Sequence, residues 1–264
     1  MSFLVNPFRY AVAGCTDADA VAFLAAAAIT DATITSAICA LVTTMKANGT
    51  WAKMQAIYPM VGGTATTHKF NLKNPADTNA AFRLSFTGGW THSANGALPN
   101  GTNSIADTFY IPATSATQNS HHLSYYSRTN SNLTEVEIGA VNSSQGSLVE
   151  ARTSNVSYFR INSAATYASA ADTNSAAYYI SNRTASNVIN GWRNSTKIAT
   201  AATVSTTLTT LRYFIGALND NAITKYYSTK QCAFASIGSG LTDGEAAALY
   251  TAVQAFQTTL SRQV

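Results

Sequence analysis

Residues 122–126 read His-Leu-Ser-Tyr-Tyr, residues 157–161 read Ser-Tyr-Phe-Arg-Ile, and residues 232–237 read Cys-Ala-Phe-Ala-Ser-Ile. Apolar and polar side chains largely alternate in these stretches, and alternation with a period of two places them on opposite faces of a β-strand. Aromatic and β-branched residues also favour strands. The three stretches therefore predict strands that bury one face against a core.

Eight further stretches between residues 68 and 227 show the same pattern. They lie at residues 68–72, 81–86, 108–111, 134–138, 177–180, 188–192, 211–216 and 223–227. Turns rich in Asn, Gly and Ser separate them, among them Asn95-Gly96 and Asn142-Ser143-Ser144. Eleven short strands at this spacing predict a mainly β protein, an antiparallel β-sandwich or jelly roll.

Helical patterns precede this β body. The Ala-rich stretch 18–28 follows Thr16 or Asp17, and either side chain is a candidate N-cap. A second helix is expected after Thr30 or Asp31, because apolar residues recur there at spacings of three and four. We expect an N-terminal helical segment.

The second helix should end at Asn48-Gly49, and a third short helical turn is expected at 51–57. At the other end of the chain, Thr242 and Glu245 have the spacing of a capping box before a helix at 244–260. The expected architecture is thus a β-sandwich with an N-terminal helical segment and a C-terminal helix.

Charge is scarce in this chain. Ala occupies 46 of 264 positions, Ser, Thr and Asn together occupy 83, and charged residues make up 11%, against about 25% in an ordinary globular protein. The net charge of +4 is scattered along the chain, so we expect no nucleic-acid partner, which would need a clustered basic patch. No apolar run reaches the roughly 18 residues of a spanning helix, so no membrane insertion is expected.

The three cysteines, Cys15, Cys39 and Cys232, show no CxxC spacing. Their odd number suggests neither a disulfide framework nor a zinc site. We expect small, buried, unpaired thiols and folding in a reducing cytoplasm.

The C-terminal part of the chain resembles a laminin-G/concanavalin A-like module. The resemblance rests on 231–238, which reads as a final strand, and on Gly240-Leu241-Thr242-Asp243-Gly244-Glu245 after it. It implies a concanavalin A-like antiparallel β-sandwich that ends in a helix.

A second resemblance is to bacteriophage virion and tail-associated structural proteins. It is carried by residues 50–59, 61–65, 68–72, 88–93, 98–103, 123–129 and 256–260. It implies a non-enzymatic virion protein of the capsid- or tail-decoration or fibre type, assembled in the host cytoplasm.

The predicted division of the chain follows from both patterns. We expect an extended arm at 1–15, a helical docking segment at 16–60, and the sandwich with its helix at 61–264. In the arm, the residues expected to anchor the protein to other virion proteins are Phe3, Leu4, Phe8 and Tyr10. Because Ala-rich helices allow close approach, we also expect a homo-oligomer, a trimer or dimer, through residues 1–58.

Catalysis is not expected. Glu135 and Glu137 lie two apart on a predicted strand, as do catalytic acids in concanavalin-fold glucanases, but Ala140 stands where the second catalytic Glu would be. We interpret the two carboxylates as a solvated strand face. No catalytic residue is assigned.

No metal or cofactor is expected either. His121 and His122 should point to opposite faces of a strand, and although His68 and His92 could meet across strands, no Cys or carboxylate accompanies them. We expect these histidines to bond to backbone groups in loops. Twelve carboxylates in the whole chain make a calcium site of six to eight oxygens improbable.

Sugar binding remains the sharper hypothesis for the β body, because sugars bind exposed aromatic rings flanked by amide and guanidinium donors. The local clusters with that chemistry comprise Trp90, His92, Tyr125, Tyr126, Arg128, Asn190, Trp192 and Arg193. The competing interpretation is that Trp90 and Trp192 are core residues. For the whole protein, the prediction is a virion structural protein whose lectin-like sandwich attaches to host-surface glycans. The alternatives are a free carbohydrate-binding module and, behind it, a glucanase-like glycoside hydrolase.

Overall fold

The computed structural model describes residues 14–264. Its helices and 3₁₀ turns are α1 (Ala18–Ala26), α2 (Ala32–Ala47), η1 (Thr50–Lys53), α3 (Ala65–His68), η2 (Asn79–Ala81), α4 (Pro112–Ser115) and α5 (Asp243–Thr259). Asp17 and Asp31 cap α1 and α2 through their carboxylates, and Thr242 and Glu245 form the predicted capping box of α5. No helix in the described part is long and apolar enough to cross a membrane.

One sheet has eight strands. They are, in spatial order, β13 (Thr196–Ala202), β12 (Val188–Arg193), β11 (Ala177–Ala185), β6 (His121–Ser127), β17 (Cys232–Gly238), β4 (Gly96–Leu98) and β3 (Thr91–Ser93), with β1 (Met54–Tyr58) also paired to β17.

The second sheet has nine strands. They are β10 (Ala168–Ala171), β9 (Val156–Ser163), β8 (Gln145–Thr153), β7 (Ile138–Asn142), β14 (Phe214–Ile215), β5 (Ile105–Asp107) and β2 (Ser85–Thr87), with β15 (Leu218–Asp220) and β16 (Ile223–Lys225) beside β7. Among the described strands, only β15 and β7 pair in parallel. The predicted antiparallel sandwich with helices near both ends is confirmed.

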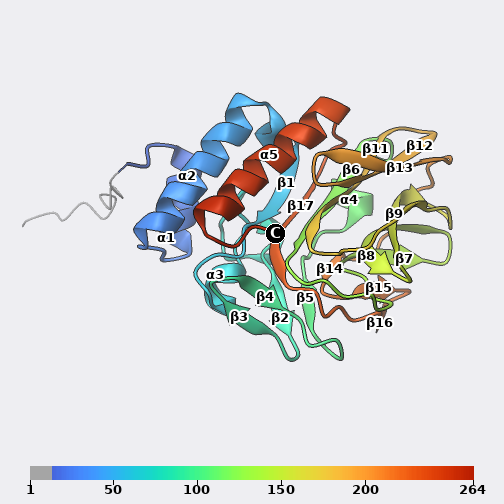
Figure 1. Cartoon of the computed structure of the whole chain (residues 1–264), viewed down its shortest axis with the longest axis horizontal. Coiled ribbons are helices and arrows are strands. Elements are labelled where there is room, and N and C mark those ends of the chain that lie inside the picture. Colours follow the sequence, from blue (N-terminus) through green and yellow to red (C-terminus); the bar gives the residue numbers. More distant parts are fainter. Residues whose placement is uncertain (1–13) are drawn as a thin grey trace, which may run out of the picture.

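The molecule has three layers, which Figure 1 shows from the side: helices, the eight-stranded sheet, and the nine-stranded sheet. One apolar cluster joins α1, α2 and α5 to the near face of the eight-stranded sheet, through residues such as Phe234 and Phe256. A second cluster, with Tyr125 and Phe159, fills the space between the sheets. The helices thus cover one sheet, and the outer face of the nine-stranded sheet lies on the opposite side of the molecule.

The helical layer covers the second face of the central strands, so polar residues that alternate along these strands are buried as well. In β6 all seven residues are buried, because Tyr125 faces the sandwich core while Tyr126 faces the helices. The expectation that each strand has one solvated face is therefore wrong for the central strands of the eight-stranded sheet.

Several local predictions also differ from the structure: no strand forms at 108–111, and the strand expected at 134–138 begins only at Ile138. The turn expected at 51–57 is helical only in η1 and continues as β1, which pairs antiparallel with β17. The strand expected at 68–72 is absent, because His68 ends α3, whose capping box joins Thr64 and Thr67. The domain boundary at residue 60 stays a prediction, although β1, before that boundary, is a strand of the eight-stranded sheet.

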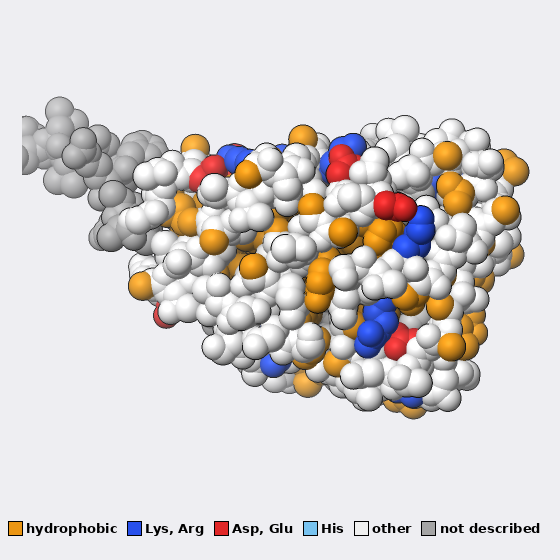
Figure 2. All heavy atoms as spheres, turned by 45° about the horizontal axis from the view of Figure 1, so that its top comes forward, with side chains coloured by type: hydrophobic (Ala, Val, Ile, Leu, Met, Phe, Trp, Pro, Cys, Tyr) orange, Lys and Arg blue, Asp and Glu red, His pale blue; other side chains and the backbone are white. Residues whose placement is uncertain are grey.

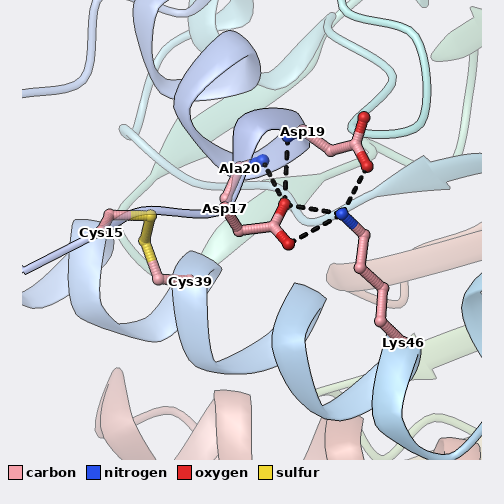
Figure 3. The surroundings of a disulfide bond; sticks show 6 residues. All are labelled: Cys15, Asp17, Asp19, Ala20, Cys39 and Lys46. Carbon is pink, nitrogen blue, oxygen red and sulfur yellow. Dashed lines mark hydrogen bonds and ion pairs between the residues drawn. A yellow bond between two sulfur atoms is a disulfide. The ribbon is translucent and has the colours of Figure 1, made fainter.

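Cys15 and Cys39 form a disulfide, so the expectation of three unpaired thiols is wrong for this pair (Figure 3). Cys232 is free and buried, as expected. The bond ties the segment before α1 to the middle of α2. Beside it, Lys46 pairs with Asp17 at 2.7 Å and with Asp19 at 2.6 Å. Disulfides persist in oxidising environments and are rare in the cytosol. The predicted disulfide-free folding in a reducing cytoplasm therefore does not fit the Cys15–Cys39 bond. The predicted anchor residues Phe3, Leu4, Phe8 and Tyr10 lie outside the described residues.

The surface in Figure 2 is mostly neutral, with charged side chains few and scattered. This agrees with the 11% charged composition. Backbone and uncharged polar side chains, with scattered hydrophobic ones, make up most of the face shown.

Candidate functional site

Two of the predicted sugar contacts lie inside the molecule. Tyr125 and Tyr126 are fully buried; the Tyr125 hydroxyl donates to the Lys230 carbonyl at 2.7 Å and the Tyr126 hydroxyl to Gln254 Oε1 at 2.8 Å. Because both faces of β6 are covered, neither ring can stack on a sugar, and the structure corrects these two assignments.

The β12 cluster is buried in the same way. Trp192 is 4% exposed and packs toward the helical layer. Asn190 is 8% exposed, and its amide oxygen accepts from Thr200. These two assignments are also corrected, and the interpretation of Trp192 as a core residue is supported. Arg193 is half-buried and pairs with Asp172, with 3.3 Å between Nε and Oδ2.

Trp90 and His92 do lie together. Their rings stack with centroids 6.3 Å apart, and Phe86 meets both edge-on. His92 Nδ1 is 2.9 Å from Nδ1 of the buried His68, so these two histidines meet as the sequence allowed. Burial lowers the pKa of His68 to about 3 and also lowers the pKa of His92. The cluster is a half-buried aromatic patch held by neutral imidazoles.

Arg128 is the remaining predicted contact. Its guanidinium donates to the Arg262 carbonyl at 2.7 Å and to Gln231 Oε1 at 3.0 Å. The eight predicted residues therefore occupy separate places in the fold and do not form one site. His121 and His122, expected in loops, are buried in β6 instead. Their ring nitrogens meet Asn162 Oδ1 and the Ser239 carbonyl, respectively.

Glu135 and Glu137 are not a solvated strand face. They are 2% and 0% exposed, and Lys230 Nζ lies 3.0 Å from Glu135 and 3.1 Å from Glu137. Burial alone would lower the pKa of Lys230, but the two carboxylates raise it above its ordinary value. The local sequence did not reveal this pairing, because Lys230 lies 95 residues from Glu135 in the chain. Its ammonium group pairs with both carboxylates. A substrate cannot reach this pair.

A different feature meets the requirements of a binding site. A cavity of about 170 Å³ opens on the nine-stranded sheet. Its apolar lining comes from Val136, Leu148 and Leu218, which form a small cluster separate from the sandwich core. Thr134, Glu150, Tyr167 and Tyr226 complete the lining. We call these seven residues the tyrosine cavity.

The tyrosine cavity carries exposed rings and one carboxyl group. Tyr167 is 37% exposed and Tyr226 is 47% exposed. Glu150 lies on β8 directly opposite Tyr158 of β9, and Tyr158 meets Tyr167 edge-on at 5.8 Å. Burial raises the pKa of Glu150 to about 7, an effect that the neighbouring Thr153 hydroxyl opposes only in part.

Sequence reasoning missed this cavity because its lining comes from segments far apart in the chain. A partial signal was present: residues 157–161 and 223–227 were predicted strands, and each includes a tyrosine of this surface, Tyr158 or Tyr226. Alternation did not reveal that these rings face solvent while those of Tyr125 and Tyr126 are covered. No cluster of His, Cys, Asp and Glu able to hold a metal ion was found within residues 14–264.

Comparison with solved structures shows a shared fold. No family model matches the chain, and no curated protein matches it. Among solved structures, domain 4 of a GH43 extracellular arabinanase from Geobacillus stearothermophilus aligns with a TM-score of 0.50 and 12% identity, over 75% of this chain and 98% of that chain. The botulinum neurotoxin serotype D binding domain aligns with a TM-score of 0.51 and 7% identity, over 76% of this chain and 52% of that chain.

Mouse laminin α1 domains LG4-5 also align, with a TM-score of 0.37 and 14% identity, over 49% of this chain and 37% of that chain. The chain spans about a quarter of the length of the Streptococcus pneumoniae NanB sialidase chain with which it aligns, covering 27% of it. The arabinanase and neurotoxin domains thus share the jelly-roll β-sandwich fold of this chain. The resemblance to phage virion proteins stays a prediction.

Proposed function

We propose that the protein is a non-enzymatic, glycan-binding β-sandwich displayed on a phage particle. The observation that carries the binding role is the tyrosine cavity, which combines exposed rings and a carboxyl group on a sheet face that the long helices leave uncovered. Aromatic rings stack on the apolar face of a sugar, and polar groups at the rim bond to its hydroxyls.

The fold neighbours support this proposal. The arabinanase domain was solved in complex with arabinotriose, and another neighbour is a neurotoxin binding domain solved in complex with SialylT. The burial of Glu135 and Glu137 supports a non-enzymatic role, because the acid pair that suggested a glucanase is out of reach of a substrate.

A glycan array tests the binding role. We expect the full chain to bind at least one host-envelope glycan, and Tyr167→Ala and Tyr226→Ala each to weaken that binding about fivefold, since an aromatic contact contributes on the order of 1 kcal/mol. Val204→Ala serves as the control, because Val204 is 73% exposed and does not line the cavity. Binding that both tyrosine variants retain in full would contradict the proposal.

The virion role is tested separately. We propose that residues 1–15, with Phe3, Leu4, Phe8 and Tyr10, attach the protein to other virion proteins, so deleting them should abolish incorporation into particles. Unchanged incorporation of the truncated protein would contradict this anchor.

The second candidate is a free carbohydrate-binding module. It is favoured by the arabinanase domain, 98% of which this chain covers. Such a module would bind the same glycans through the tyrosine cavity but would be absent from purified particles. Mass spectrometry of particles purified from an infected culture would show whether the protein is present in them.

A further inference from the structure

Building on the proposed function, we propose that the tyrosine cavity recognises an ammonium group carried by the host-surface glycan, with Glu150 as its counter-ion and Tyr167 and Tyr226 as its aromatic walls. The group would be a protonated amine or a methylated ammonium on the polymer. Glycan binding alone does not require such a group.

The tyrosine cavity is small. Pockets that enclose a drug-sized ligand usually have about 300–1,000 Å³, and the tyrosine cavity has about 170 Å³. It is too small to enclose an oligosaccharide but large enough for one substituent of a few heavy atoms. The rest of the glycan would lie outside it, within reach of the partly exposed Tyr158 ring.

Glu150 is the one carboxyl group among the residues that line the cavity. Of the twelve Asp and Glu residues of the chain, all but Asp31 and Glu150 form an ion pair within the described residues. Asp31 caps α2. Glu150 therefore has neither a cationic partner nor a helix terminus, although it is largely desolvated.

Arg160 lies on β9, which pairs with the strand of Glu150, but the two side chains form no ion pair. Its guanidinium is committed elsewhere, because it donates to the Ser163 carbonyl at 2.8 and 3.1 Å and stacks over the Tyr167 ring at 5.7 Å. The buried Glu137 raises the pKa of Glu150 further, and Lys230 lowers it. The carboxyl group is left for a cation from outside.

Two aromatic rings, those of Tyr167 and Tyr226, also line the cavity. A cation near a ring face is attracted by the ring quadrupole, and cages of aromatic residues recognise quaternary ammonium ligands in this way. Tyr167 and Tyr226 line the cavity together with Glu150, so a cation bound there would be attracted both by the carboxylate and by the rings. A neutral sugar substituent would leave the ionised carboxylate without compensation.

The test uses choline chloride as a permanent cation and 3,3-dimethylbutan-1-ol as its neutral counterpart of the same shape, titrated into the full chain by NMR. We expect choline to bind more tightly than the alcohol, and Glu150→Gln to remove the difference. Asp77→Asn is the matched control, because Asp77 is an exposed carboxylate outside the cavity. Glucosamine against N-acetylglucosamine extends the comparison to a primary ammonium and identifies which source the site prefers.

The pH dependence provides a test that needs no variant. With a pKa of about 7, Glu150 is largely ionised at pH 8 and largely protonated at pH 5.5. Choline binding should therefore weaken on the order of 30-fold as the pH falls between these values, while binding of the neutral alcohol should not change.

Equal binding of choline and the alcohol would overturn the inference, as would choline affinity that is unchanged in Glu150→Gln. In either case the proposed function would survive if the array still shows a glycan whose binding Tyr167→Ala and Tyr226→Ala weaken. Array binding that ignores both tyrosines would contradict the proposed function itself, so the two failures are distinguishable.

Discussion

Arg262 joins three parts of the fold through one buried guanidinium. It is 1% exposed and donates to the carbonyls of Pro59, Met60 and Ala233, each at 2.7–2.9 Å. Gln257 Oε1 accepts a further bond at 2.6 Å. The residue thus fixes the end of the chain after α5 to the loop that follows β1 and to β17.

Replacing Arg262 by Ala should therefore lower the free energy of unfolding by about 3 kcal/mol, because several buried carbonyls lose their donor at once. Chemical denaturation measures the loss. Arg212→Ala is the control: Arg212 is 47% exposed in its ion pair with Asp107, so that change should cost less than about 1 kcal/mol. Equal losses in the two variants would contradict this account.

Buried histidines make the fold sensitive to acid. Burial lowers the pKa of His68 and His121 to about 3 and that of His122 to about 4, against 6.5 when exposed. The unfolded chain binds these protons first, so the stability is fully present above pH 6.5 and is lost as the pH falls toward 4. Glu150 acts in the opposite direction between pH 4.5 and 7, because its folded pKa is raised.

Four histidines with lowered pKa values, His92 included, oppose two glutamates with raised ones, Glu137 and Glu150, so the denaturation midpoint should be lower at pH 4.5 than at pH 6.5. His121→Gln should reduce this pH dependence, since it removes one of the four histidines. A wild-type midpoint that rises on acidification would contradict the assignment.

At the scale of elements, the Cys15–Cys39 bond closes a loop with a sequence separation of 24 residues. A loop of this length restricts the unfolded chain by about 3 kcal/mol in the chain-entropy description. Cys39→Ala should therefore lower the free energy of unfolding by roughly that amount, measured in oxidised protein. The same variant measured against reduced wild type should show a much smaller difference, and an equally large one would argue against the cross-link as the cause.

Strand prediction succeeded for five of the long, regularly paired strands, but it missed β8 and β13. Strands β6, β9, β11, β12 and β17 all lie over predicted stretches. It failed around residues 81 and 108, where Phe82 and Phe109 have positive φ values of 59° and 55°, a conformation that the residue type does not announce. The N-caps of α1, α2 and α5 were predictable because capping is local chemistry.

The site was less predictable than the fold for the same reason. Burial of Tyr126 depends on α5 lying across β6, and neutralisation of Glu135 depends on Lys230 far along the chain. The tyrosine cavity needs β8, the segment before β10 and the segment after β16 to meet on one face. The spacing of residues along the chain does not show which distant segments come into contact.

At the scale of the whole molecule, the helical layer and the tyrosine cavity lie on opposite sides of the sandwich. In Figure 1, α1 lies at one end of the long axis, and β7, β8 and β9 of the nine-stranded sheet lie toward the other end. Gly14, the first described residue, precedes α1. This arrangement suits a protein held through its N-terminal segment and presenting the cavity outward, as proposed above.

The proposed homo-oligomer belongs to this scale too. We expect the full chain to be a dimer or trimer by light scattering and deletion of residues 1–15 to reduce its mass to that of a monomer. A full-length chain that is monomeric at all concentrations would contradict the proposed assembly through residues 1–58.

The disulfide has a mechanical consequence for a protein held in this way. Tension applied at the N-terminal end would pass through Cys15 into Cys39, in the middle of α2, and would bypass α1 and the turn after it. Because α2 packs along α5, the load would reach the sandwich as shear along two helices, and α1 would not be peeled away turn by turn. A single covalent bond would thereby shorten the extensible part of the tether to the residues that precede it.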